Sequence, residues 1–287
     1  MEQQLLSACK KGNIEEVKKL LNEQNINLNC QDQNNNDRTP LDYACRFENI
    51  EIVKLLLNDQ RVDINSSNNS GATPLYIACQ EGNIEIVKLL LNDQRIDVNK
   101  ANDADETPFF IACCHEHIEI VKLLLNDKRV DINQANKDNV SPFWIACQEG
   151  FIEFVKLFLD VERVEVNKAD KNDQTPFYIT CSYGHVKIVE LLFNDKRIDI
   201  TKSKDNGVTP FFIACQNGFV QVVKLLLNDQ RVDVNKASDD ALTPFWIACQ
   251  KERTEIVNIL KNESNFFIFF FHFFFSFFFF FSSFFFF

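Results

Sequence analysis

A Thr-Pro pair recurs every 34 residues, and this period constrains the fold more than any other feature of the sequence. A fixed period of this length is typical of a solenoid, in which one supersecondary unit is repeated and stacked. With Ser-Pro filling one place, the pairs contain all seven prolines of the chain. The first residues of the pairs are Thr39, Thr73, Thr107, Ser141, Thr175, Thr209 and Thr243.

Residues 73–106 serve as an example of the unit. Thr73 is suited to cap a helix, and Pro74 then occupies the first helical position, where its missing N–H costs nothing. We expect a first helix that runs to about Gln80 and is broken at Gly82, since glycine tolerates left-handed backbone. Apolar residues at helical spacing predict a second helix over residues 84–91, with Ile84, Val87, Leu90 and Leu91 on its buried face.

An extended return should follow the second helix and end in a turn before the next Thr-Pro pair. Gly, Asp and Asn tolerate positive φ, and they occupy the tip of this turn in six of seven places. Those residues are Asp37, Gly71, Asp105, Asn139, Asp173 and Gly207, with Ala241 as the exception. The sequence therefore predicts β-hairpin-like loops between helix pairs.

This unit resembles the ankyrin repeat. The resemblance rests on the Thr-Pro-Leu start, the small pair Ala78-Cys79, Gly82, the run at residues 86–91 and the finish Asp97-Val98-Asn99. It covers roughly residues 3–263, and the period lies within a residue of the usual 33. The resemblance implies an all-α fold: an ankyrin-repeat solenoid of stacked helix-turn-helix units with β-hairpin-like loops.

Two departures from the family pattern stand out. The residues Asn92-Asp93-Gln94-Arg95 replace the Gly-containing turn that usually follows the second helix, which lengthens the unit by one residue. The usual His at the fourth position is replaced, mostly by an aromatic residue, and the preceding Leu is often Phe. We therefore expect a ladder of rings along the stack, worth about 0.5–1.5 kcal/mol per adjacent pair. The two positions hold Asp42, Tyr76, Phe110, Trp144, Tyr178, Phe212 and Trp246, and Phe109, Phe143, Phe177, Phe211 and Phe245.

The period divides the chain into four parts. Residues 1–38 lack Thr-Pro and are expected to form an N-terminal capping repeat, with a polar surface that includes Lys10, Lys11, Lys18 and Lys19. Residues 39–242 hold six ankyrin-like repeats, and residues 243–263 hold a truncated C-terminal repeat. Residues 264–287 form a Phe-rich low-complexity tail.

The tail has three competing interpretations. It is long enough and uncharged enough to anchor the chain in a membrane as a helix. It also has the composition of an aggregation-prone strand. The interpretation we favour is an error in the gene model, because near-pure Phe is what a T-rich stretch of non-coding DNA gives when translated, and membrane spans prefer Leu, Ile and Val with basic flanks.

The net charge and the cysteines indicate which class of partner and which redox setting to expect. The formal net charge of −11 argues against a nucleic-acid binder, whose surface would be basic, and it suits a basic partner. The start of the chain has no basic and apolar signal sequence, so we expect a reduced, cytoplasmic setting without disulfides. Eight cysteines share one repeat position and are interpreted as small buried apolar residues: Cys9, Cys45, Cys79, Cys113, Cys147, Cys181, Cys215 and Cys249.

Three patterns suggest chemistry but have simpler explanations. Residues 113–117 contain Cys and His, the usual zinc ligands, but Cys113 and His117 occupy ordinary repeat positions. No Cys has an evident base and orienting group, so a nucleophilic site is not predicted. The carboxylates of the return, such as Asp93 and Asp97, lack the spacing and Gly of a calcium loop. We interpret them as caps and hydrogen-bond acceptors of the turn, with Arg95 close enough for a screened ion pair. We therefore predict no catalytic residue, no metal site and no cofactor.

The predicted function is a non-catalytic protein-protein interaction module, an adaptor or scaffold that acts as a monomer. Its partner would be a protein that binds the concave face, and the acid excess of the chain favours a basic partner. The alternative is a membrane-tethered scaffold anchored by the Phe-rich tail, so that a membrane is involved only if the tail is real. We expect contacts from the loop tips and first-helix ends that vary between repeats: Asp103, Glu106, Cys114, His115, Lys137, Asp138, Gln148, Glu149, Lys171, Asn172, Ser182 and Tyr183.

Overall fold

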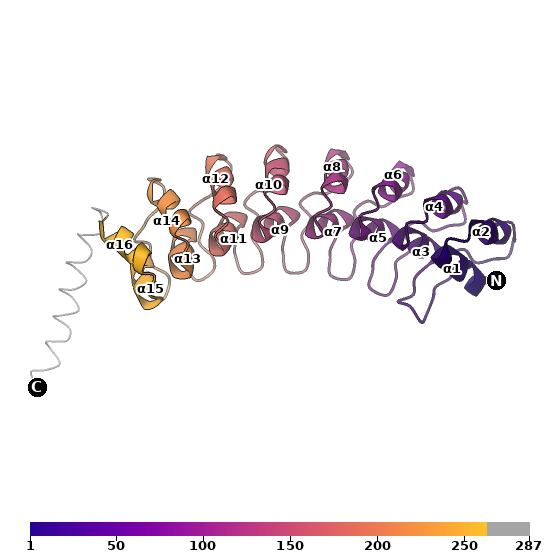
Figure 1. Ribbon diagram of the computed structural model, residues 1–287, viewed down its shortest axis with the longest axis horizontal. Coiled ribbons are helices and arrows are strands. Elements are labelled where there is room, and N and C mark those ends of the chain that lie inside the picture. The colour runs from indigo at the N-terminus through magenta and orange to yellow at the C-terminus, as the bar shows by residue number, and fades with distance from the viewer. Residues whose placement is uncertain (263–287) are drawn as a thin grey trace, which may run out of the picture. The chain divides into compact units, whose positions relative to one another are not determined.

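The computed structural model describes residues 1–262, which form sixteen α-helices and no β-strand. The chain divides into two compact units, residues 1–165 (unit 1) and residues 166–287 (unit 2), and each is described by itself. Every repeat contributes a first helix and a second helix (Figure 1). The expected all-α architecture of paired helices is therefore confirmed over the described residues.

The helix bounds follow the 34-residue period. Unit 1 contains α1 (Glu2–Lys11), α2 (Ile14–Leu21), α3 (Pro40–Arg46), α4 (Ile50–Leu57), α5 (Pro74–Glu81), α6 (Ile84–Asn92), α7 (Pro108–Cys114), α8 (Ile118–Asn126), α9 (Pro142–Glu149) and α10 (Ile152–Leu159). Unit 2 contains α11 (Pro176–Tyr183), α12 (Val186–Asn194), α13 (Pro210–Asn217), α14 (Val220–Leu227), α15 (Pro244–Gln250) and α16 (Thr254–Asn262).

Within each unit the helices lie in two layers. In unit 1 the first helices α1, α3, α5, α7 and α9 pack side by side, and the second helices form the other layer (Figure 1). The loops project on the side of the first helices, away from the second helices. Each second helix turns one apolar stripe inward. In α6 this stripe is Ile86, Val87, Leu90 and Leu91, so the prediction is wrong for Ile84, which is half-buried.

The first helices begin and end where the sequence predicts. The Thr73 hydroxyl accepts a hydrogen bond from the Tyr76 backbone N–H at 3.2 Å, which caps α5. Gly82 ends α5 with a φ of 80°, in the left-handed region. Three repeats have a glutamate at the place of this glycine and adopt the same backbone: Glu48, Glu116 and Glu252, with φ of 56°, 59° and 57°.

The loops are hairpin-like, as expected. In one of them the Asn102 N–H donates to the Glu106 carbonyl at 3.0 Å, and Asp105 at the tip has a φ of 61°. The six tip residues predicted to take positive φ all do so, between 51° and 75°. Ala241, the apparent exception, also has a φ of 60°, so its backbone carries the strain that a non-glycine residue meets there.

Backbone hydrogen bonds also join neighbouring loop tips. The Asp103 N–H donates to the Ser70 carbonyl at 3.0 Å, and the Lys137 N–H donates to the Ala104 carbonyl at 3.1 Å. These bonds fix the spacing of the tips. The tips of unit 1 therefore form one continuous row.

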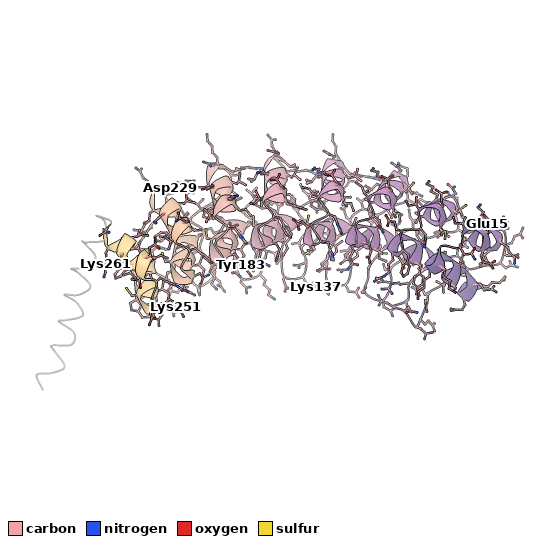
Figure 2. All side chains as sticks on the ribbon, in the orientation of Figure 1. Glu15, Lys137, Tyr183, Asp229, Lys251 and Lys261 are labelled. Carbon is pink, nitrogen blue, oxygen red and sulfur yellow. The ribbon has the colours of Figure 1, made fainter. Side chains whose placement is uncertain are left out.

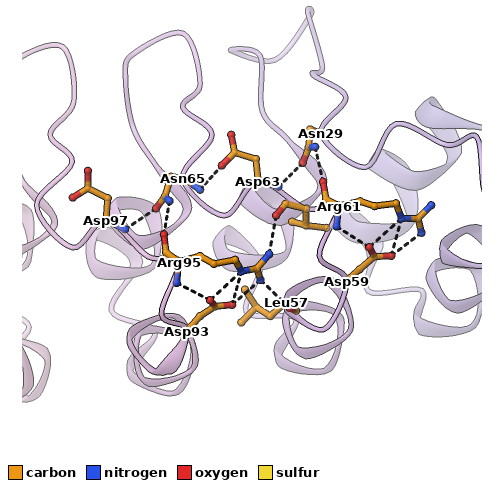
Figure 3. A network of polar contacts seen from close by, with 10 residues as sticks. Asn29, Leu57, Asp59, Arg61, Asp63, Asn65, Asp93, Arg95 and Asp97 are labelled. Carbon is orange, nitrogen blue, oxygen red and sulfur yellow. Dashed lines mark hydrogen bonds and ion pairs between the residues drawn. The ribbon is translucent and has the colours of Figure 1, made fainter.

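A row of asparagines, which we call the asparagine row, links the returns of successive repeats (Figure 3). Asn65 donates from Nδ2 to the Arg95 carbonyl at 2.7 Å, and its Oδ1 accepts from the Asp97 N–H at 2.8 Å. One side chain thus satisfies two backbone groups of the next repeat. The row consists of Asn29, Asn65, Asn99 and Asn133 in unit 1, and of Asn167 in unit 2.

The extra residues of the long turn make a second link between repeats. Arg95 is held by Asp93, with Nη2 to Oδ2 at 2.6 Å, and Nη2 also donates to the Leu57 carbonyl at 3.0 Å (Figure 3). Leu57 is the last residue of α4, where carbonyls lack helical partners and a cation is favourable. Because the Arg95 guanidinium donates hydrogen bonds to the Asp93 carboxylate, the pKa of Asp93 lies below its usual value.

Four arginines of unit 1 form the same bond to the preceding second helix. Arg61, Arg95, Arg129 and Arg163 each donate to the carbonyl at or near the end of the preceding second helix, at Leu21, Leu57, Leu91 and Leu125. Asp59, Asp93 and Asp127 each pair with the arginine two residues later, as expected for aspartates that stabilise the turn. The arginines also have a second role. They connect one repeat to the one before.

Most aromatic residues at the predicted positions of the first helices are buried, and two of them, Phe109 and Phe143, contact a ring outside their own row. Tyr76, Phe110, Trp144, Tyr178 and Phe212 are all 5% exposed or less, whereas Trp246 is 41% exposed. Phe158 of α10 takes part in two ring pairs of unit 1. Phe109 and Phe143 each meet Phe158 edge-on, with centroids 5.9 and 5.7 Å apart. The second helix therefore supplies the ring that joins two first helices.

The periodic cysteines are buried from Cys9 to Cys215, and Cys249 is exposed. Cys30, outside the row, is also buried, and all ten are free thiols. Burial raises the pKa of Cys9 to about 12, and it also raises the pKa values of Cys45, Cys79, Cys113, Cys181 and Cys215. These thiols are therefore protonated apolar groups that pack, as expected from their register.

The predictions for the Phe-rich tail, residues 264–287, lie outside the described residues. Within residues 1–262, no helix combines the length and the hydrophobicity that crossing a bilayer requires.

The lysines of the first repeat are exposed, as predicted for a capping repeat with a polar surface. They are Lys10, Lys11, Lys18 and Lys19.

Candidate protein-binding surface

The last turns of the first helices and the loop tips form one face of each unit, which we call the first-helix face. From α3 to α13, the start of each first helix is buried at its capping Thr or Ser, and the end of the helix is more exposed. The two residues directly after each periodic cysteine are exposed or half-buried. They differ from repeat to repeat, unlike the buried frame.

Cys114 and His115 lie together at the end of α7. His115 is exposed, and its ring stacks on that of His117, with centroids 6.0 Å apart and an interplanar angle of 18°. His117 in turn bonds through Nε2 to the Gln80 carbonyl of the preceding repeat at 2.9 Å. His117 therefore links two repeats, and its ring packs against that of His115.

Cys114 is half-buried in an acidic environment. Burial and the nearby carboxylates Glu106 and Glu149 raise its pKa to about 12. Since the thiolate is the reactive form, this side chain is a poor nucleophile at neutral pH. No group of three His, Cys, Asp or Glu side chains in residues 1–262 is arranged to share a metal ion, and His117 is engaged elsewhere.

Two predicted residues at the tip after α6 play different parts. Asp103 is exposed, and its backbone is held by the neighbouring tip. Glu106 is half-buried: its Oε2 accepts from the Tyr76 hydroxyl at 3.0 Å and from Asn102 Nδ2 at 2.9 Å. Glu106 is thus tied into the loop, and Asp103 is the more accessible of the two.

The next repeat of unit 1 presents a lysine and several acidic or amide groups. Lys137 lies exposed at the loop tip (Figure 2), with Asp138 beside it. At the end of α9, Gln148 Nε2 donates to Glu149 Oε1 at 2.7 Å, and Glu149 is exposed. Unit 1 therefore brings eight of the predicted residues to its first-helix face.

The other four predicted residues belong to unit 2. Lys171 and Asn172 are exposed at a tip, where Asn172 is held by Asp170 through its N–H at 3.0 Å. Tyr183, at the end of α11 (Figure 2), is 52% exposed and stacks on His185, with centroids 6.0 Å apart. The Ser182 carbonyl accepts from Asn217 Nδ2 at 2.8 Å, so Ser182 contributes to packing within the unit.

The predicted set omitted the equivalent residues of the first two repeats. Lys10 and Lys11 follow Cys9, and Arg46 and Phe47 follow Cys45, in the same register as Cys114 and His115. All four are exposed, and Phe47 is one of the few large apolar side chains with nearly half of its surface in solvent, at 45%. The two positions after the periodic cysteine were a sufficient signal to find them.

The comparisons with known proteins agree with this architecture. The family model described as ankyrin repeats (3 copies) matches residues 3–68, 60–136, 109–204 and 194–268. A comparison with curated proteins found no matching relative. Since the family model covers nearly all of the described residues, the chain belongs to the ankyrin-repeat family.

Proposed function

We propose that this chain is a non-catalytic adaptor or scaffold that binds a protein partner on its first-helix face, the concave face expected of stacked repeats. This proposal rests on a contrast: the repeated side chains bond to neighbouring repeats, whereas the variable side chains face solvent. The repeated Asn65 and Arg95 are consumed by bonds to neighbouring repeats. The variable His115 and Tyr183 face solvent on a rigid support.

The chemistry of the middle of unit 1 favours a basic partner segment. Glu106 and Glu149 lie close enough to Cys114 to raise the pKa of its thiol, and Glu149 is exposed. An extended basic segment would pair with these carboxylates and stack on His115. Complementary charge of this kind adds specificity and speeds association.

The test is affinity capture from a native lysate with the full chain, read by mass spectrometry. His115→Ala and Tyr183→Ala remove one exposed ring in each unit. Lys128→Ala and Lys187→Ala are matched controls that shorten an exposed side chain on the second-helix side of the same units.

The expected result is a protein that the parent and both controls retain and that one or both ring variants lose by about tenfold, as for a contact worth about 1.4 kcal/mol. Retention by all variants alike would refute the site. Equal losses in the controls would show that binding does not depend on the first-helix face.

A further inference from the structure

A hollow of about 430 Å³ opens at the N-terminal end of unit 1, between α1, α3 and the first loop. Leu6, Lys10, Lys11, Asp32, Tyr43 and Phe47 contribute to its lining. Its exposed residues include Lys10, Lys11 and Phe47, which lie in register with Cys114 and His115. The hollow therefore belongs to the same kind of surface as the candidate site, but its chemistry is different.

Aromatic rings form one wall of this hollow. Phe47 stacks on Tyr43, with centroids 6.2 Å apart and an interplanar angle of 15°. Tyr43 is 2% exposed and is fixed by a hydrogen bond from its hydroxyl to Asp32 Oδ2 at 2.7 Å. Phe47 thus presents a ring on a rigid base, where an apolar or aromatic side chain would gain stacking and burial. The next repeat has Glu81 at this position.

Positive charge surrounds the rings. Lys10 Nζ lies 5.6 Å from the centre of the Tyr43 ring, and Lys11 is exposed and forms no ion pair within residues 1–262. Arg46 is exposed next to Phe47 and reaches Glu81 at a distance of 3.5 Å.

The acidic group in the lining is Asp32, whose oxygens accept from Tyr43 and from Asn35 Nδ2 at 2.8 Å. In a chain with a formal net charge of −11, the lining of this hollow carries two lysines and one aspartate.

We infer that this hollow docks an acidic segment of a protein partner, with an apolar or aromatic side chain on Phe47 and carboxylates on Lys10 and Lys11. The inference rests on the proposed function and specifies the partner's chemistry at one end of the face. A protein segment fits better than a nucleic acid, because the Asp32 carboxylate and the acidic net charge repel a continuous polyanion. Since Glu81 and Glu149 make the following repeats acidic, a partner that spans unit 1 has a defined direction.

The test uses the full chain and fluorescent peptides in anisotropy titrations. The probe is a short peptide with one Trp flanked by Asp and Glu. The comparison probes replace its Trp by Ala, or its acidic residues by Lys, and a single-stranded RNA of similar length is the fourth ligand. Lys11→Glu reverses a charge at the hollow, and Lys19→Glu makes the same change in the same repeat on α2. Phe47→Ser removes the exposed ring.

The acidic Trp probe should bind, and Lys11→Glu should weaken it by about tenfold, as expected for a rim charge that steers and pairs with a ligand. Phe47→Ser should weaken it by about fivefold, and Lys19→Glu by less than about twofold. Circular dichroism of each variant checks that the fold is retained.

Equal effects of Lys11→Glu and Lys19→Glu, no binding of the acidic probe below about 1 mM, or tighter binding of RNA would each overturn the inference. These outcomes leave the His115 and Tyr183 test unaffected, so failure here is distinguishable from failure of the proposed function.

Discussion

Exchanging the residues at two equivalent repeat positions, Asn99→Thr and Thr201→Asn, measures how strongly the asparagine row stabilises the stack. Asn99 Nδ2 donates to the Arg129 carbonyl at 2.8 Å, and its Oδ1 accepts from the Asp131 N–H at 2.8 Å. Thr201 occupies the same place two repeats beyond Asn133, and its hydroxyl bonds to Asp199 of its own return at 2.8 Å. The native chain thus contains both the link and its natural interruption.

The structure sets the size of the effect. Asn99→Thr removes two hydrogen bonds, each with a net worth of about 0.5–1.5 kcal/mol. Both bonds lie in an exposed part of the structure, where water replaces some of what is lost. The free energy of unfolding should therefore fall by about 1–2 kcal/mol.

Thr201→Asn offers the same two bonds to the carbonyl of Arg231 and the N–H of Asp233. Neither group has another hydrogen-bond partner among residues 1–262. The gain should be smaller, about 0.5–1 kcal/mol, because ordering the new side chain costs entropy.

Urea denaturation followed by circular dichroism would measure both variants and the double variant. The two sites are in different units and share no partner, so their effects should add within about 0.5 kcal/mol. A loss below about 0.3 kcal/mol for Asn99→Thr, or a destabilised Thr201→Asn, would refute the reasoning, because the distances would then carry no net stability.

Two further predictions concern single residues. Glu116→Gly should raise the free energy of unfolding by about 0.5–1 kcal/mol, because it relieves a φ of 59° at a place where other repeats have glycine; an unchanged or lower thermal midpoint would contradict this. Burial raises the pKa of Asp42 to about 7, so folding takes up a proton above pH ~4, and stability should fall between pH ~4 and 7 by on the order of 1.4 kcal/mol per unit. Asp42→Asn should remove this fall, and parallel pH profiles of the two proteins in urea titrations would exclude Asp42 as its cause.

The helices and loop tips could be predicted from sequence because their causes are local. Thr73 caps a helix through the N–H three residues on, and Asp105 tolerates positive φ by itself. The links between repeats could not be predicted from the sequence because they join residues that are far apart in the chain. Arg95 was expected to pair with a nearby aspartate, which it does, but its bond to the Leu57 carbonyl spans 38 residues. Such bonds depend on how far a long side chain reaches once the repeats are stacked.

The aromatic positions show a second limit. Periodicity identified Phe109 and Phe143 as equivalent, and equivalence suggested that rings would meet rings of the same row. In the structure Phe158, from a different helix, meets both of them edge-on. A sequence period shows which residues repeat, but the neighbours of a ring depend on side-chain packing in three dimensions.

The asparagine row has a consequence for how such a chain can lengthen. Each repeat that belongs to the row presents an amide on one edge and a matching carbonyl and N–H on the other, so the two edges are complementary. An in-frame duplication of one whole period preserves this match at both new junctions, wherever in the repeat it begins, whereas an insertion one residue shorter misaligns the register. A duplication that includes Thr201 would copy the interruption as well. The position of that threonine therefore determines which parts of the stack can be extended by copying without losing a link.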